Sequence, residues 1–329
     1  MPSFQAERVW LAPMSGSTDA AFRRQAVRYG APAVVSEMVA GEALAAARPD
    51  VVRKTCRHDG DGLWIVQLAG RRPEDIKRGA EILKEAGVDV IDINMGCPSR
   101  QVTGGNSGSA LMREPDLAHR IIEATLEGAN GTPVTLKTRL GWDHTLVNAP
   151  EIARDAVDLG VELVTIHGRT RCQFYKGTAD WSAIRETVAA VPVPVIANGD
   201  IHSFEDAKQA LNESEAYGVM IGRAAMGQPW LLGQISAFMA GQSYEIPTLS
   251  AQLEGLCAQI EDSLTLYGGS LGIRIVRKHI AAHIDKLDRS IDPQARRQLR
   301  ADVCRIEDPN QLMQALSEIY LGEHARVAA

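Results

Sequence analysis

The chain of 329 residues lacks the features that mark membrane, secreted or metal-binding proteins. No run approaches the roughly 20 apolar residues of a membrane span, and the N-terminus has no basic segment followed by an apolar one. The five cysteines are scattered and form no CxxC pair, so neither a disulfide framework nor a zinc or iron–sulfur site is indicated. We therefore expect free thiols, no metal, no membrane association and a cytoplasmic location.

A net charge of −6 at pH 7 gives the chain no overall attraction for nucleic acid. The charge is uneven, however, because residues 271–300 contain eight lysines and arginines against three aspartates. The spacing of Arg274, Arg277 and Lys278 predicts that they share one helix face. Such a face is either an ordinary solvated surface or a phosphate-binding surface, and the pattern leaves both open. The eight cations are Arg274, Arg277, Lys278, Lys286, Arg289, Arg296, Arg297 and Arg300.

Short apolar runs rich in valine and isoleucine recur along the first two thirds of the chain. Segments with helical periodicity separate most of them; in residues 73–87, for example, Ile76, Ala80 and Leu83 fall on one face. Eight strands alternating with helices predict an α/β fold, a (β/α)8 TIM barrel, with a doubly wound open sheet as the alternative. The runs are residues 9–14, 33–39, 63–69, 88–95, 133–140, 161–168, 193–200 and 217–224.

The residues at the strand ends favour the barrel. Almost every predicted strand ends in a side chain that can bind or react, and a barrel gathers all eight ends at one mouth, whereas an open sheet spreads them along an edge. We therefore predict a barrel over residues 1–240. After the linker GQSYEIPTLS the periodicity is helical, which predicts a smaller all-helical domain over residues 241–329. The strand-end residues are Met14, Glu37, Gln67, Asn94, Lys137, His167, Asn198 and Arg223.

The stretch INMGCPSRQVTGGNSGSALM (93–112) places Cys97 just after the fourth predicted strand. A lone cysteine is usually a small buried residue at a tight turn. A turn does not require so long a glycine-rich continuation, so we interpret Cys97 as the leading catalytic candidate.

Two late strand ends predict a phosphate site. Asn198-Gly199-Asp200 and Gly222-Arg223 follow consecutive strands, at the position where this fold commonly holds phosphate. Alone, His167 would be an ordinary hydrogen-bonded histidine. Beside Lys137 and Arg169 it becomes part of a predicted anion-binding wall.

Lys137 and Gln67 extend this site to a cofactor. A lysine inside a barrel is paired, forms a Schiff base, or lies beside an anionic group. Together with the phosphate site, these residues predict an FMN across the mouth, with Lys137 near its N1 and O2 edge and Gln67 at its pyrimidine-like edge. A thiol is mostly protonated at neutral pH, so Cys97 is suited to supply a proton beside such a hydride carrier.

Nine motifs in order along the chain resemble those of the tRNA-dihydrouridine synthases, most closely the bacterial DusB subfamily. The resemblance covers nearly the whole chain. It implies an FMN-binding TIM barrel followed by a helical tRNA-binding domain that contains GIRIVRKH (272–279). The motifs are LAPMSGSTD (11–19), VSEMV (35–39), QLAG (67–70), INMGCPSRQV (93–102), GSALM (108–112), KTRLGWD (137–143), TIHGRTR (165–171), VIANGDI (195–201) and MIGRAAMGQPWLL (220–232).

The resemblance also implies roles for these residues. Cys97 would donate a proton to C5 of uracil while reduced FMN gives a hydride to C6, and NADPH would reduce the flavin separately. Asn94 and Arg169 would lie near the flavin or the target base, and Arg274, Arg277 and Lys278 would contact tRNA. The subfamily points to U17 in the D-loop of tRNA, and no protein partner is implied. The FMN-binding residues would be Pro13, Met14, Gln67, Lys137, His167, Asn198, Gly199, Asp200, Gly222 and Arg223.

Three other functions remain open at this point. An FMN barrel of the dihydroorotate dehydrogenase type would act on a small molecule and would not need the basic helical domain. A tRNA-binding or folding protein with an inactive barrel would not need Cys97, Lys137 and His167. An aldolase would use Lys137 as a Schiff base and would bind no flavin, which a visible spectrum detects.

Overall fold

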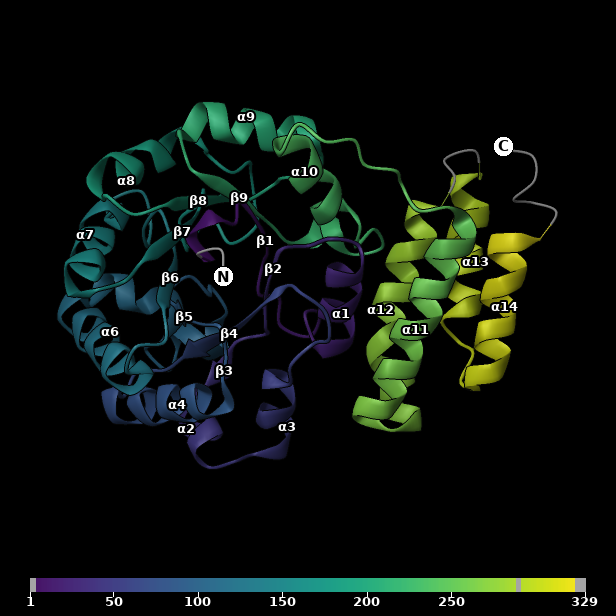
Figure 1. The fold of residues 1–329 in the computed structure, drawn as a ribbon, viewed down its shortest axis with the longest axis horizontal. Helices are drawn as coiled ribbons and strands as arrows, with labels where there is room; N and C mark the ends of the chain where they lie inside the picture. Colours follow the sequence, from purple (N-terminus) through teal and green to yellow (C-terminus); the bar gives the residue numbers. More distant parts are fainter. Residues whose placement is uncertain (1–3, 288–290, 323–329) are drawn as a thin grey trace.

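The computed structural model describes residues 4–287 and 291–322, within which eight parallel strands close into a barrel (Figure 1). Each of these strands pairs with the next, and β1 also pairs with β9, where Trp10 lies opposite Met220. This closure confirms the TIM barrel and excludes the open sheet. The strands are β1 (Val9–Leu11), β2 (Ala33–Val35), β4 (Leu63–Ala69), β5 (Val90–Asn94), β6 (Val134–Arg139), β7 (Leu163–His167), β8 (Val195–Asn198) and β9 (Gly218–Ile221).

The second predicted strand, residues 33–39, is divided into β2 and the two-residue β3 (Val39–Ala40). The chain bends between them, where the Ser36 hydroxyl donates to the carbonyl of Glu37 at 2.8 Å. The Glu37 carboxylate accepts the N–H of Gly16 in the loop after β1. Glu37 therefore holds a neighbouring loop, and the expectation that every strand-end side chain faces the mouth is wrong at this position.

Helices on the outside of the barrel cover the strands. Helix α4 (Pro73–Ala86) shows why they form: Pro73 begins it, Gly87 ends it with φ +76°, and Ile76 and Leu83 are buried against the sheet. The others are α1 (Ala20–Arg28), α2 (Gly41–Ala45), α3 (Pro49–Val52), α6 (Pro115–Ala129), α7 (Ala149–Leu159), α8 (Arg185–Ala190), α9 (Phe204–Ser214) and α10 (Leu231–Met239). The four-residue α5 (Arg100–Thr103) lies instead in the loop after β5, at the mouth of the barrel. Short 3-10 helices are η1 (Phe4–Ala6), η2 (Arg53–Thr55), η3 (Gly108–Arg113), η4 (Ser182–Ile184) and η5 (Arg223–Ala225).

The barrel strands are buried on both faces. Side chains such as Trp10, Ile65 and Leu163 fill the barrel interior, while Leu11 and Val66 pack outward against the helices. Because neither face meets water, the strands read as continuous apolar runs in the sequence. Polar residues are therefore concentrated at the strand ends.

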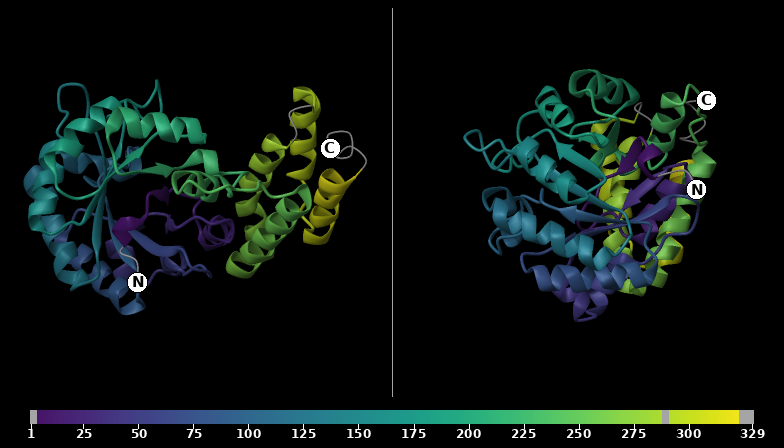
Figure 2. Two further views of the ribbon diagram at one scale, coloured as in Figure 1. Left: turned by 45° about the horizontal axis from the view of Figure 1, so that its top comes forward. Right: turned by 60° about the vertical axis from the view of Figure 1, so that its left-hand side comes forward.

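Four further helices form a bundle with a core of its own. They are α11 (Leu249–Tyr267), α12 (Gly269–Lys286), α13 (Pro293–Val303) and α14 (Pro309–Leu321), and Ile260, Val276 and Leu316 are buried between them. Figures 1 and 2 show the bundle beside the barrel, on the side of α1. In the described residues, no helix combines the length and apolar character needed to cross a membrane.

Hydrogen bonds and ring contacts fix the bundle against the barrel. The Tyr267 hydroxyl donates to Asp19 at 3.1 Å, and the Tyr29 hydroxyl donates to the carbonyl of Ala251 at 2.8 Å. The rings of Phe22 and His279 lie 4.6 Å apart. Asp19 caps α1 at the end of the loop after β1, so the bundle is attached directly beside the mouth of the barrel.

Candidate functional site

A cavity of about 580 Å³ opens at the carboxyl ends of the strands. The loops after β1, β5, β7, β8 and β9 form much of its wall, as expected for this fold. The structure brings together here all ten residues predicted to hold FMN, and with them Asn94 and Cys97. The ten are Pro13, Met14, Gln67, Lys137, His167, Asn198, Gly199, Asp200, Gly222 and Arg223.

A chain of hydrogen bonds connects the cavity floor to Cys97. The buried Asp92 carboxylate accepts the Nε2–H of Gln67 at 2.6 Å, and Oε1 of Gln67 accepts the Nδ2–H of Asn94 at 2.7 Å. Oδ1 of Asn94 in turn accepts the backbone N–H of Cys97 at 3.0 Å. Because a carboxylate can only accept, Asp92 determines which end of the Gln67 amide faces it.

Two ionisable groups lie close to this floor: Asp92 is buried below it, and Lys137 lines the cavity. Burial raises the pKa of Asp92, although hydrogen bonds from Thr135 and Gln67 oppose that rise. Burial, followed by the charge of Arg139, lowers the pKa of Lys137. Nζ of Lys137 donates to Oδ1 of Asn198 at 3.1 Å, which holds the ammonium group at the cavity wall. A lysine held in this way is suited to bind an anionic edge of a ligand.

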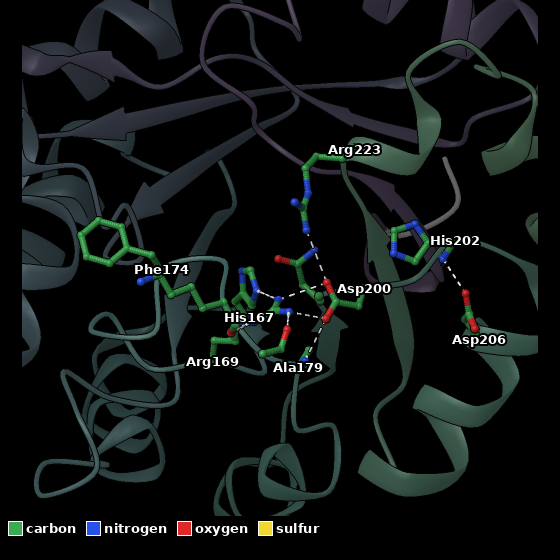
Figure 3. A network of polar contacts seen from close by, with 12 residues as sticks. His167, Arg169, Phe174, Ala179, Asp200, His202, Asp206 and Arg223 are labelled. Carbon is green, nitrogen blue, oxygen red and sulfur yellow. Dashed lines mark hydrogen bonds and ion pairs between the residues drawn. The ribbon is translucent and has the colours of Figure 1, made fainter. Parts of the chain in front are cut away.

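Asp200 organises the opposite end of the cavity (Figure 3). Burial would raise its pKa, but hydrogen bonds from Arg169 and Ala179 and the charges of Arg169 and Arg223 hold that pKa below its ordinary value. Arg169 donates both terminal nitrogens to the Asp200 carboxylate, and Arg223 approaches it at 3.4 Å. The exposed Arg223 is thereby directed over the mouth, where it can bind phosphate.

Arg169 lies behind the cavity wall, which differs from its predicted position near the flavin or base. It is 1% exposed and donates to the carbonyls of Lys176 at 3.1 Å and Gly177 at 2.7 Å, as well as to Asp200. These bonds use up its donors, so it shapes the loop after β7. The sequence motif HGRT could not reveal this, because two of the acceptors lie further along the same loop and the third, Asp200, lies in the loop after β8.

His167 contributes a neutral ring to the predicted anion-binding wall, so the positive charge of the wall comes from its neighbours. Burial, and then the charges of Arg139, Lys137, Arg169 and Arg223, lower its pKa well below the ordinary value. Nη1 of Arg169 lies 3.3 Å from Nε2 of His167. A guanidinium can only donate, so Nε2 accepts and the ring carries its proton on Nδ1.

Gly199 is required by its surroundings. Its φ is +119°, and a Cβ at this position would lie 2.7 Å from Cβ of Ala179 and 3.1 Å from the His167 ring. Any other residue would force the loop after β8 away from the cavity. The glycine therefore lets the loop after β8 pass close to Ala179 and to the His167 ring at the cavity.

Two cavity residues, Arg139 and Tyr175, were missed by the sequence analysis. Arg139 donates to the carbonyls of Gly96 at 2.8 Å and Phe174 at 3.0 Å, so it joins the Cys97 loop to the loop after β7. Tyr175 is 57% exposed, with Arg139 and Arg223 near its ring. Strand alternation could have identified Arg139, because it lies two residues after Lys137 and on the same face. Tyr175 lies in a loop and gave no such signal.

The three cations of α12 do not form one open face. Nη2 of Arg277 lies 3.9 Å from Oε1 of Glu307. Lys278 points to the barrel, and its Nζ lies 3.6 Å from the position that a Cβ atom would take on Gly16. Arg274 is exposed. The neighbouring helices and the barrel separate side chains that the helical spacing placed together. Arg289, another of the eight predicted cations, lies outside the described residues.

The residues of the cavity fit an FMN. Lys137 supplies a positive charge at the cavity wall, and Gln67 supplies an amide whose orientation is determined by Asp92. Arg223 begins η5, whose first N–H groups have no partner within that helix. Such donors suit a ring edge at one end and a phosphate at the other.

Comparison with known proteins identifies the family. The family model for dihydrouridine synthase (Dus) matches residues 10–323. A probable tRNA-dihydrouridine synthase of Rhodobacter capsulatus is 48% identical over 92% of this chain and 91% of its own length, and the tRNA-dihydrouridine synthase B of Xanthomonas axonopodis pv. citri is 40% identical over 93% and 90%. Histamine dehydrogenase from Rhizobium sp. 4-9 shares the fold, with a TM-score of 0.53 and 15% identity over 78% of this chain; the chain spans 49% of that protein. The chain belongs to the dihydrouridine synthase family.

Proposed function

We propose that this protein reduces the C5–C6 double bond of a D-loop uridine in tRNA, using bound FMN as hydride carrier and NADPH as reductant. Membership of the dihydrouridine synthase family makes the chain a flavin-dependent oxidoreductase that acts on tRNA. The similarity to a tRNA-dihydrouridine synthase B supports U17 as the target. Because tRNA is the substrate, we expect the protein to act in the cytoplasm.

The placement of Cys97 carries the proposal. Its N–H is bound by Asn94, whose amide also orients Gln67 at the cavity floor, so the thiol loop and the predicted flavin site form one hydrogen-bonded unit. A proton donor held beside a cofactor site in this way suits addition of a proton and a hydride to one double bond.

In this reaction FMN, when bound, supplies the hydride to C6 of uracil. The Cys97 thiol donates its proton to C5, and the thiolate then takes up a proton from solvent. Lys137 and Gln67 bind the ring system of the cofactor, while Arg223 and the Gly199 loop hold its phosphate. His167, whose ring is neutral, adds no positive charge to this site.

We assign different roles to the two parts of the chain. Residues 1–240 form the catalytic domain, and residues 241–329 form a tRNA-binding domain whose exposed cations contact the nucleic acid. The target uridine must leave the tRNA fold to reach the cavity, which costs a few kcal/mol. Contacts elsewhere on the tRNA offset that cost.

The alternatives have less support. A small-molecule oxidoreductase of the dihydroorotate dehydrogenase type, and an aldolase, do not account for a family match over residues 10–323. A non-catalytic tRNA-binding protein does not require Cys97, Lys137 and His167 to line one cavity.

The proposal is tested with purified protein, NADPH and tRNA that lacks modifications. We expect a yellow protein that forms dihydrouridine at position 17, mapped by primer extension. Cys97→Ala should retain FMN but lose about 10²–10⁴-fold in turnover, the range for removal of a proton donor. Cys172→Ala, which removes an exposed thiol, is the matched control. A yellow protein that leaves tRNA unchanged would refute the proposed substrate, and a colourless protein that takes up no FMN would refute the cofactor.

A further inference from the structure

Four side chains beside the cavity form an arginine–aromatic cluster: Arg113, Trp142, Arg171 and Phe174. The guanidinium carbon of Arg113 lies 3.9 Å from the centre of the Trp142 ring. Arg171 lies 4.5 Å from the Trp142 ring and 4.8 Å from the Phe174 ring. Planar guanidinium groups are thus held by ring faces, which leaves N–H donors along their edges.

The cluster joins the loops that follow three consecutive strands. Arg113 ends η3 in the connection after β5, Trp142 follows β6, and Arg171 follows β7. Backbone bonds of 2.9 Å hold the last two loops together, from the N–H of Arg171 to Gly141 and from the N–H of Cys172 to Trp142. The positions of the two guanidinium groups are therefore built into the mouth of the barrel.

The positive charge of the cluster is not balanced by carboxylates. Within residues 4–287 and 291–322, neither Arg113 nor Arg171 takes part in an ion pair within 4.0 Å. The nearby Asp143 carboxylate is used within its own turn, where it accepts the N–H groups of Thr145 and Leu146. Nε of Arg171 is buried and has no hydrogen-bond partner. In a chain of net charge −6, two arginines held without anions indicate an external anionic partner.

The location of the cluster specifies that partner. Phe174 lines the cavity, and Arg171 donates to Thr103 in the Cys97 loop at 3.2 Å. Helices α6 and α7, which begin beyond these loops, lie across the barrel from the α11–α14 bundle (Figure 1). The cavity therefore lies between the bundle and the cluster.

We propose that the cluster is a second RNA-binding surface, which binds backbone phosphates of the tRNA on the side of the mouth opposite the bundle. This inference rests on the proposed function, because it assumes that tRNA is the substrate. Arginine is suited to bind phosphate through two N–H groups at once, and aromatic rings keep its side chain extended toward the nucleic acid. With contacts on both sides of the cavity, the RNA segment that carries the target uridine is held across the mouth.

The test measures binding of fluorescently labelled unmodified tRNA to the FMN-loaded enzyme, at several salt concentrations. Arg113→Gln should weaken binding about 3- to 10-fold. It should also make the slope of the logarithm of the binding constant against the logarithm of the salt concentration (the salt slope) shallower by about one released counterion. Arg113→Lys keeps the charge, so it should preserve the slope while losing part of the affinity. Arg154→Gln, which removes an exposed arginine from α7, should bind as wild type does. If Arg113→Gln matches Arg154→Gln, the inference is wrong.

A measurement on the wild-type enzyme covers the case in which a variant misfolds. Phenylglyoxal modifies accessible arginines, and bound tRNA should protect Arg113 in peptide mass spectra while leaving Arg154 reactive. Equal modification of Arg113 with and without tRNA would overturn the inference. Wild-type enzyme that binds no tRNA at all would instead refute the proposed function, so the two failures are distinguishable.

Discussion

Asp92 lies below the cavity floor, yet it determines how the floor is presented to a ligand. Its carboxylate accepts from Gln67 at 2.6 Å and from the Thr135 hydroxyl at 2.7 Å. Gln67 must therefore turn Oε1 toward Asn94, which completes the connection to Cys97. A single buried carboxylate thus orients both the predicted flavin contact and the thiol loop.

We expect Asp92→Asn to weaken FMN binding at least about tenfold, because an amide can donate as well as accept and no longer dictates the orientation of Gln67. Thr135→Val is the matched control, since it removes the other hydrogen bond to the Asp92 carboxylate but leaves the Gln67 amide facing that carboxylate. Flavin fluorescence gives both dissociation constants. Equal loss in the two variants would show that Asp92 has only a packing role.

Helix α12 packs against the barrel through a glycine. Gly227 has φ +77°, and a Cβ on it would lie 2.2 Å from the carbonyl oxygen of Ala282. No side chain can be accommodated between this loop and the helix unless one of them moves. The close approach of the two parts of the molecule depends on this residue.

Gly227→Ala should therefore lower the free energy of unfolding by about 1–3 kcal/mol more than Gly241→Ala does. Gly241 has a similar φ of +70°, but nothing lies within 4 Å of its Cβ position, so it isolates the backbone strain. Denaturant unfolding of both variants gives the comparison. Similar losses would mean that the junction adapts to a methyl group.

The same helix carries two buried histidines, His279 and His283. Burial, followed by the charges of Lys278 and His283, lowers the pKa of His279 to about 3, and burial lowers that of His283 to about 4. Both rings are neutral in the folded protein at neutral pH. His279 contacts Phe22 of the barrel, and His283 lies 3.3 Å from the Tyr320 hydroxyl.

Acid should consequently destabilise the bundle and its junction with the barrel. Because the folded pKa values lie below the ordinary value of 6.5, this stability is present above pH 6.5 and is lost as the pH falls toward 4. Each ring contributes a loss of about 3 kcal/mol by pH 4. Burial raises the pKa of Asp19 and Glu37, so the folded state takes up these protons more readily than the unfolded state does as the pH falls. This partly offsets the loss of stability from the two histidines.

The test compares the pH dependence of unfolding in His283→Gln with that in His144→Gln. His283→Gln should flatten the curve between pH 6.5 and 4, because one titrating ring has been removed. His144 is exposed, so its variant should follow the wild type. An unchanged slope in His283→Gln would exclude the ring as a source of acid sensitivity.

On the scale of the whole molecule, cations on opposite sides of the cavity are available for one nucleic acid. Arg274 is exposed on α12 of the bundle, and Arg113 lies across the mouth in the arginine–aromatic cluster. Figure 2 shows the bundle attached along one side of the barrel only. The two arginines belong to separate parts of the fold and share no partner among the described residues.

We therefore expect Arg274→Gln to weaken tRNA binding about 3- to 10-fold, and its effect to add to that of Arg113→Gln. The double variant should show the product of the two single losses in the same fluorescence titration, with Arg154→Gln as control. A double variant no weaker than either single variant would mean that the two residues do not bind tRNA independently.

The amino-acid sequence by itself determined the barrel and most of the cavity. Strands buried on both faces produce continuous apolar runs, and parallel strands in a barrel bring their carboxyl ends to one mouth. For these reasons Gln67, Lys137 and Asn198 could be assigned to one site from their positions along the chain. Cys97 was marked by the loop that follows it.

Only the tertiary structure decided how side chains from separate loops meet. Arg169 turns behind the wall because Asp200 and two carbonyls accept its donors, and His167 loses its charge because burial and four cations disfavour protonation. The separation of Arg277 from Lys278 depends on which neighbour packs against each side of α12. The local sequence specifies the spacing of apolar residues and the position where each strand ends. These contacts, in contrast, join residues from separate segments of the chain and form only when the fold closes.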